Sequence, residues 1–281
     1  MTESHGIDDE QAARWNGPAG RAWVAAQEPL DRMFEPFERL LVDAVRAEGA
    51  GRVLDVGCGT GATTLAVARE LASASGATGI DISEPMIALA RTRAERSGVP
   101  ATFIRASAQD HAFEPARFDL IVSRFGVMFF DAPARAFANL RGAARSRAAL
   151  RAIAWRSAGE NPFMTAAERA AAPLLPNLPP RRRDAPGQFA FADPQRVRAL
   201  LEESGWGDTD LQPIDVACTL PEADLELYLS RMGPVGQALS DADERTRAQV
   251  SDVVRAAFAP YVHGSEVRFT AACWMVAARA P

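Results

Sequence analysis

Short apolar runs alternate with segments of helical periodicity between Arg52 and Trp155, and this alternation constrains the fold more than any other feature of the chain. The apolar runs are "RVLDV", "ATGID", "ATFIRA", "FDLIVS" and the weaker "ALRAIAW". Helical patterns over 63–71, 84–96 and 133–144 separate them. Such alternation is typical of βαβ units, in which helices cover both faces of a parallel sheet. The region is therefore predicted to be of the α/β class.

The C-terminal part of the chain predicts a different connection. A helix over 193–203 is followed by a strand over 211–220, a helical stretch over 222–261 and a final strand, "VRFTAACWMVAA". Two strands at the end of a sheet are most simply paired as an antiparallel hairpin. We therefore expect a hairpin whose strands are separated by a long helical insertion.

Several local signals mark loops and helix ends. Ser83 can cap the helix that follows it, and Pro85 lies in the first turn of that helix. The proline-rich segment 171–187 predicts an irregular loop over the carboxyl edge of the sheet. The arginines at 181–183 in this loop are expected to form a solvated run.

The N-terminal 48 residues are predicted to form a helical flap and a packing helix. Trp15 and Trp23 lie on two short helical pieces, which are separated by a break at Gly17, Pro18 and Gly20. Pro36 either begins the following helix or kinks it. One apolar stripe at helical spacing defines this packing helix: Leu30, Met33, Phe34, Phe37, Leu40, Leu41, Ala44 and Val45.

Charge and composition exclude several classes of partner. The chain has 31 basic and 36 acidic residues, a net charge of -5 and no long block of one sign, so nucleic acid is not expected as a main partner. The first fifteen residues lack the pattern of a signal peptide, and no apolar run is long enough to span a bilayer. These features predict a cytoplasmic protein that does not bind membranes.

Cysteine and histidine usage predicts neither a disulfide framework nor a metal site. The residues concerned are scattered along the chain: Cys58, Cys218, Cys273, His5, His111 and His263. Cys218 and Cys273 are expected to be small buried residues.

The segment "RVLDVGCGTGATT" predicts a tight turn around a bound ligand, because glycine adopts positive φ readily and lets a ligand approach the backbone. Its spacing also satisfies the relaxed dinucleotide fingerprint, with Asp81 at the position of a ribose-binding acid. Asp55 separates the two ligand classes. A carboxylate there would repel a pyrophosphate and would attract a ligand that carries an ammonium and a sulfonium. An NAD(P)-linked oxidoreductase remains the alternative.

Three segments then carry a resemblance to a known family. "VLDVGCGTG" resembles motif I of the class I S-adenosylmethionine-dependent methyltransferases, "TGIDIS" resembles their second motif, and "RFDLIVSRFGVMFF" resembles their fourth-strand segment. The chain is most similar to the group around the ubiquinone and menaquinone biosynthesis methyltransferases, whose acceptors differ widely. The resemblance implies a Rossmann-like methyltransferase sheet, mostly parallel, over 49–281, with insertions at about 157–190 and 221–264 that cover the acceptor.

The resemblance also implies a cofactor site for S-adenosyl-L-methionine. The glycine turn would contact the methionine part, Asp55 its amino group, Asp81 both ribose hydroxyls and Ile82 the adenine. The residues expected around the cofactor are Trp15, Trp23, Asp55, Gly57, Cys58, Gly59, Thr60, Gly61, Asp81, Ile82, Met86, Ser107, Ala108, Gln109, Ser123, Arg124 and Phe125.

The sequence departs from the family at two places. Ser107 stands where the family has an acid that receives the adenine amino group, so either Ser107 or Asp110 is expected to make this contact. The segment 146–148 replaces a Pro-Gly-Gly turn before the fifth strand, which predicts an altered loop geometry. Arg124 either faces the pocket or pairs with a carboxylate of an insertion.

The implied reaction is in-line transfer of a methyl group to a small-molecule acceptor, in which a side-chain base is optional. No catalytic residue is assigned, and His111 is expected to be a packed spacer. Trp15 and Trp23 are either lid residues or packing anchors. A non-enzymatic protein that binds the cofactor is a second alternative. Apolar residues expected to enclose the acceptor are Phe163, Met164, Leu174, Leu175, Phe189, Phe191, Leu227, Tyr228, Met232 and Leu239. The sequence defines neither the acceptor nor the oligomeric state.

Overall fold

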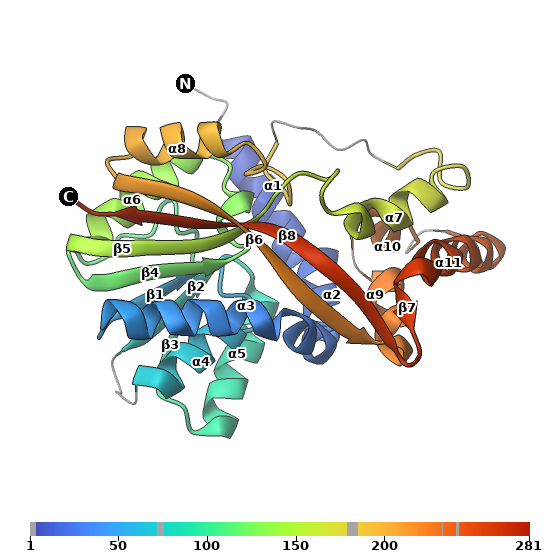
Figure 1. Cartoon of the computed structure of the whole chain (residues 1–281), viewed down its shortest axis with the longest axis horizontal. Coiled ribbons are helices and arrows are strands. Elements are labelled where there is room, and N and C mark those ends of the chain that lie inside the picture. The colour runs from blue at the N-terminus through green and yellow to red at the C-terminus, as the bar shows by residue number, and fades with distance from the viewer. Residues whose placement is uncertain (1–3, 72–75, 179–184, 232, 240–241) are drawn as a thin grey trace.

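One mixed sheet organises the molecule (Figure 1). The computed structural model describes residues 4–71, 76–178, 185–231, 233–239 and 242–281. The strand order is β3-β2-β1-β4-β5-β8-β6, and β7 pairs with β8. The strands are β1 (Val53–Val56), β2 (Ala77–Asp81), β3 (Ala101–Arg105), β4 (Phe118–Arg124), β5 (Ala144–Trp155), β6 (Gly207–Pro221), β7 (Val262–His263) and β8 (Glu266–Arg279).

Strands β1 to β5 are parallel, whereas β8 runs antiparallel to both β5 and β6. Helices α3 (Gln27–Glu48), α4 (Ala62–Leu71) and α5 (Glu84–Ser97) lie on one side of the sheet. Helices α6 (Pro133–Ala143) and α8 (Pro194–Glu203) cover the other side (Figure 1). The predicted fold, including the C-terminal antiparallel hairpin, is confirmed. Central strands are apolar on both faces because both are covered.

The N-terminal segment forms α1 (Ser4–Asn16) and α2 (Pro18–Ala25) before α3 begins. The predicted break is shorter than expected, because Gly17 alone separates the two helices and Gly20 lies inside α2. Pro36 lies inside α3 and therefore does not begin that helix. The apolar stripe is buried over most of its length, and Phe37 and Leu41 are fully covered. This burial fastens α3 to the sheet and places the flap beside the carboxyl ends of the strands.

The predicted cap of α5 is made differently. The hydroxyl of Ser83 donates to the carbonyl oxygen of Trp15 at 2.7 Å and makes no bond to its own helix. Asn16 supplies the cap instead, because its Oδ1 accepts from the backbone N–H of Glu84 at 2.8 Å. Ser83 is completely buried beneath α1, so its hydroxyl is used to satisfy a carbonyl of the flap.

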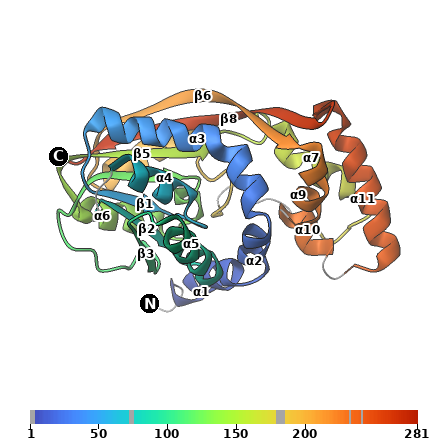
Figure 2. The same cartoon turned by 90° about the horizontal axis from the view of Figure 1, so that it is seen from below.

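The hairpin of β6 and β8 extends well beyond β5 and carries a group of helices at its far end (Figure 2). These are α7 (Pro162–Ala171), α9 (Leu225–Arg231), α10 (Gly233–Leu239) and α11 (Glu244–Phe258), with short 3-10 helices at Glu222–Asp224 and Ala259–Tyr261. A further 3-10 helix, Val127–Phe129, follows β4. Arginines 181–183 lie outside the described residues. The division into a flap and a domain with two insertions stays a prediction.

The segment 146–148 lies within β5 rather than in a loop. Arg147 has a φ of +66°, and its N–H donates to the carbonyl oxygen of Ala280 at 2.8 Å. This replaces the expected loop by an irregular strand start held by the C-terminus. None of the helices in the described part of the chain has both the length and the apolarity needed to cross a bilayer.

Candidate functional site

The glycine turn after β1 is built by close backbone contact. Gly57 has a φ of +68°, and a Cβ atom on it would lie 2.6 Å from the Cα of Gly126. Only glycines allow this approach, so both positions require them. At the end of β2, Asp81 accepts from the N–H of Gly59 at 2.9 Å and from that of Ser83 at 2.8 Å. Asp81 thereby holds the turn and the start of α5 together.

Asp55 is a buried carboxylate with spare hydrogen-bonding capacity. It is 2% exposed, and its Oδ2 accepts from the hydroxyl of Thr64 at 2.6 Å. Its Oδ1 is buried and has no hydrogen-bond partner among the described residues. Burial raises the pKa of Asp55 from 3.8 to about 6, although the Thr64 hydrogen bond opposes this. A buried oxygen of this kind calls for a donor from a ligand.

Arg124 supplies a positive charge in the same pocket. Its guanidinium carbon lies 5.6 Å from the ring centroid of Phe34, and Nη1 donates to the carbonyl oxygen of Phe34 at 3.4 Å. Burial lowers the pKa of Arg124, and the nearby charges of Asp31 and Asp55 oppose this. The described residues show no salt bridge from Arg124 to an insertion, so the pocket-facing alternative is the one observed.

Nearly all the residues predicted around the cofactor line this one pocket, which lies between the carboxyl ends of the strands and the flap. Gly61 and Ser123 are the exceptions. A Cβ on Gly61 would meet Phe103 at 3.0 Å, so this glycine permits packing beneath the turn. Ser123 is buried, and its hydroxyl donates to the carbonyl oxygen of Val56 at 2.7 Å. Both residues support the pocket from behind.

The structure separates the two candidates for the adenine contact. Ser107 lines the pocket, whereas Asp110 is exposed, forms an ion pair with Arg135 and does not line it. His111 packs edge-on against Phe113 at 4.7 Å between ring centroids and is also outside the lining. Its geometry is that of the expected spacer.

Several lining residues were not predicted. Phe34 was expected only in the packing stripe, yet its ring reaches the pocket. Phe125, which was predicted, follows β4 with a φ of +66°, which is strained for a bulky residue, and it stacks on Trp155 at 4.4 Å. The remaining unpredicted members are Gln11, Val56, Thr63, Ile80, Ala106, Gly126, Phe129, Phe130 and Asp131. No local sequence signal shows whether a residue on the apolar face of a helix contacts a ligand or the hydrophobic core.

A second cavity adjoins the first, and we call it the acceptor chamber. Five aromatic residues line both spaces: Trp15, Trp23, Phe34, Phe125 and Phe129. Its other walls come from α2, α7, α9, α10 and α11. Most of its lining is apolar or aromatic, and Arg14, Glu168, Gln188 and Tyr228 supply its charged, amide and hydroxyl groups.

Only part of the predicted enclosure faces this chamber. Phe163, Met164 and Tyr228 line it. Six others do not and pack instead against the hydrophobic core or lie within it: Leu174, Leu175, Phe189, Phe191, Leu227 and Leu239. Met232 lies outside the described residues. Apolar composition therefore predicted which segments enclose a cavity, but not which side chains face it.

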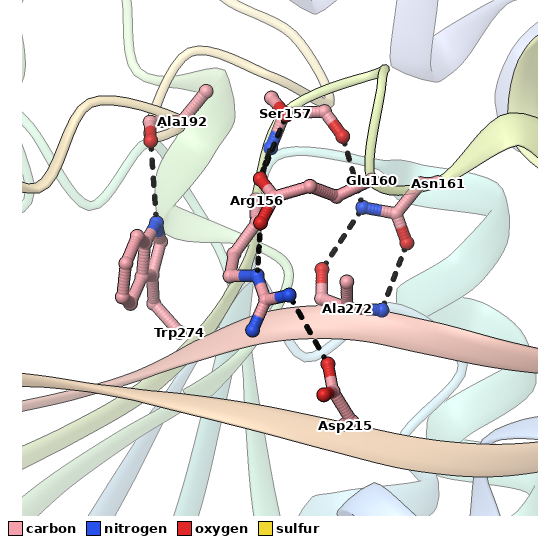
Figure 3. Close-up of polar contacts among 8 residues, drawn as sticks. All are labelled: Arg156, Ser157, Glu160, Asn161, Ala192, Asp215, Ala272 and Trp274. Carbon is pink, nitrogen blue, oxygen red and sulfur yellow. Dashed lines mark hydrogen bonds and ion pairs between the residues drawn. The ribbon is translucent and has the colours of Figure 1, made fainter.

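Polar contacts fasten the start of the first insertion to the hairpin (Figure 3). Asn161 is completely buried, and its amide both donates to the carbonyl oxygen of Ala272 and accepts from its N–H, each at 2.9 Å. Arg156 pairs with Glu160 at 3.0 Å and with Asp215 at 3.2 Å. The side-chain amide of Asn161 therefore makes the same pair of hydrogen bonds to β8 as a neighbouring strand would. This fixes the start of α7, whose side chains line the acceptor chamber.

Comparison with known proteins agrees with this architecture. Residues 53–146 match the family model described as "Methyltransferase domain". The chain is 37% identical over 117 residues to the ubiquinone biosynthesis O-methyltransferase of Cronobacter sakazakii, covering 40% of this chain and 46% of that protein. The chain thus spans about half the length of the curated relatives it matches.

Two solved structures share the fold. The YcgJ protein from Bacillus subtilis has a TM-score of 0.56 at 15% identity and covers 86% of this chain and 97% of its own. The [4+2]-cyclase SpnF has a TM-score of 0.53 at 20% identity, with coverages of 87% and 81%. These likenesses show that the chain shares a Rossmann-like fold with both proteins. Residues 53–146 carry a methyltransferase domain of the class I S-adenosylmethionine-dependent type, which confirms the predicted resemblance.

Proposed function

We propose that this protein transfers a methyl group from S-adenosylmethionine to a small, largely apolar molecule, in the cytoplasm. The observation that carries the proposal is that two spaces share walls. A pocket with groups of opposite charge, the buried Asp55 and the half-buried Arg124, lies beside an aromatic chamber. The first suits a zwitterionic amino acid group, and the second suits an apolar molecule. The fold alone would not carry the proposal, since one solved structure with this fold is called a cyclase.

The residues fit the parts of the cofactor. The orphaned Oδ1 of Asp55 would accept from its ammonium, and Arg124 would pair with its carboxylate. Asp81 uses two lone pairs on backbone N–H groups, and a carboxylate has about four, so it can also accept from ribose hydroxyls. Ser107 and Ile82 line the remainder of the pocket, where the adenine would bind.

The cofactor supplies a methyl group already activated on a sulfonium sulfur. The chain's own part is to hold the acceptor in line and to exclude water. The aromatic residues shared by the two spaces would contribute to both, because their apolar rings form walls of each space. Arg124 and Asp55 orient the donor and take no part in proton transfer in this scheme.

Calorimetry with S-adenosylmethionine, S-adenosylhomocysteine and NADH tests the cofactor assignment. We expect binding of the first two and none of NADH. Tight binding of NADH alone would support the oxidoreductase instead.

A screen of apolar small molecules, with release of S-adenosylhomocysteine as its signal, tests the reaction. Binding without turnover on any of them would favour the non-enzymatic alternative.

Replacing Asp81 by alanine is expected to weaken cofactor binding by roughly 1.5 to 3 kcal/mol, the usual range for hydrogen bonds to a charged group. The loss has two sources, because Asp81 also holds the N–H of Gly59. The dissociation constant of S-adenosylhomocysteine measures it. A folded variant with an unchanged constant would exclude Asp81 from the site.

Hydrogen exchange should report whether the flap closes over the cofactor. Trp15 and Trp23 lie on α1 and α2, which line both spaces. We expect exchange over residues 8–28 to slow when S-adenosylhomocysteine is added, since a ligand that contacts these helices should suppress their opening. Equal exchange with and without the ligand would make the flap a purely structural element.

A further inference from the structure

A chain of polar contacts runs from the start of α3 to the glycine turn and meets the cofactor pocket only at its last member, Thr60. Gln27, the first residue of α3, donates to Oδ2 of Asp31 at 2.5 Å. The same oxygen pairs with Nη2 of Arg93 at 2.6 Å. Nη1 of Arg93 then donates to the carbonyl oxygen of Thr60 at 2.7 Å. The flap helix α2 ends at Ala25, two residues before Gln27, so the chain of contacts begins at the base of the flap.

The last contact of this chain is the important one. Thr60 lies in the glycine turn and lines the cofactor pocket, whereas Arg93 lies on α5 and does not line it. A guanidinium is a rigid fork of donors, so its two ends can fix two partners relative to each other. Here one end holds a carbonyl of the turn and the other holds α3. The side chains of Arg93 and Asp31 are 22% and 21% exposed, so water screens their attraction less than that of a surface pair.

The same part of α3 reaches the pocket directly. Phe34, one helical turn after Asp31, lines both cavities, and its ring and carbonyl contact Arg124. A shift of α3 that broke the Asp31–Arg93 pair would therefore disturb both the glycine turn and the Arg124 side chain. The pair holds these two parts of the pocket in one arrangement.

We infer that Arg93 is a positioning residue for cofactor binding, which acts by tying the Thr60 carbonyl of the glycine turn to Asp31 of α3. The inference rests on the proposed function, since it concerns the same cofactor. It extends that function to a residue outside the pocket, and it links the base of the flap to the turn.

The test is a double-mutant cycle on the full chain, read as the dissociation constant of S-adenosylhomocysteine. Arg93→Met should weaken binding about tenfold, the lower end of what a hydrogen bond to a charged group contributes. Asp31→Asn should weaken it less, because Arg93 can still donate to Thr60. In the Arg93→Met background, Asp31→Asn should add almost nothing, since coupled residues are not additive. Arg93→Lys should recover binding only in part, because an ammonium lacks the fork.

Arg46→Met is the matched control. Arg46 also ties α3 to a neighbouring helix, because it pairs at 2.6 Å with Glu70, which lies at the end of α4 opposite the glycine turn. It should leave the dissociation constant unchanged. Thermal unfolding of each variant without ligand shows whether weaker binding is caused by a loss of folding. If Arg93→Met does not fold, the dissociation constant of Asp31→Asn tests the inference.

The outcomes separate the two claims. Wild-type protein that does not bind S-adenosylhomocysteine would overturn the proposed function and this inference with it. Wild-type binding together with an unchanged constant in Arg93→Met would overturn the inference alone. Losses that simply add in the double variant would also overturn it, because the two residues would then act separately.

Discussion

Replacing Asp55 by asparagine should weaken binding of S-adenosylhomocysteine at pH 8 about 10- to 100-fold, as expected for loss of a charged hydrogen-bond partner in a buried site. The wild-type carboxyl has a pKa of about 6 in the free protein, and a ligand ammonium beside it would lower this value. Wild-type binding should therefore strengthen as the pH rises from about 5 to 7. In the Asp55→Asn variant this component should be absent. Calorimetry across this range measures both effects.

The same carboxyl should make the free protein less stable as the pH rises, whereas ligand binding should become stronger. Its folded pKa lies above its ordinary value of 3.8, so the folded state binds the proton more tightly. The stability it contributes is complete below pH 3.8 and is lost as the pH rises through about 6, by about 3 kcal/mol in all. Denaturant unfolding at several pH values should show the Asp55→Asn variant gaining by this amount relative to wild type. A constant difference across the range would contradict the raised pKa.

Filling the acceptor chamber should abolish methyl transfer and leave the cofactor bound. Ala22 on α2 and Ala167 on α7 line the chamber and not the cofactor pocket. A phenylalanine at either position occupies space that the acceptor needs. With an acceptor found by the screen, we expect turnover to fall at least about 100-fold, since a small misplacement of reacting groups already has an effect of this size.

Ala25→Phe is the control for Ala22→Phe. It is on the same helix, is exposed and lines neither cavity. Its turnover should match that of the wild type. Full activity in both Ala22→Phe and Ala167→Phe would show that the acceptor binds elsewhere. Loss of affinity for S-adenosylhomocysteine in these variants would instead show that the two spaces are not separable.

The sheet could be predicted because periodicity is a local property. Strands β1 to β4 correspond to short apolar runs in the sequence, and the alternating burial along β6 fits the position of this strand at the edge of the sheet. Asp55 and Asp81 could also be predicted, because the ends of β1 and β2 meet at one edge of the sheet. In both cases, residues close together in the sequence determine the structural feature.

Contacts between distant segments could not be predicted in this way. The helical stripe of α3 indicated that Phe34 is buried, but not that it meets Phe125 at 5.4 Å beside the pocket. Arg93 looks like any polar residue of an amphipathic helix. The cap of α5 comes from Asn16, many residues earlier, because the flap folds back onto the end of β2. These contacts depend on how the helices pack against one another, and hydrophobic periodicity does not predict that packing.

The length of the β6–β8 hairpin has a consequence for how such a chain can diversify. The half that pairs with β5 belongs to the cofactor sheet, whereas the half beyond Trp155 supports α7 and α9 to α11 (Figure 2). Substitutions, insertions or wholesale replacement in the outer half can reshape the acceptor chamber while the donor pocket keeps its residues. Under the proposed function, a graft of another outer half onto these two strands should change which acceptor is methylated and leave cofactor binding intact.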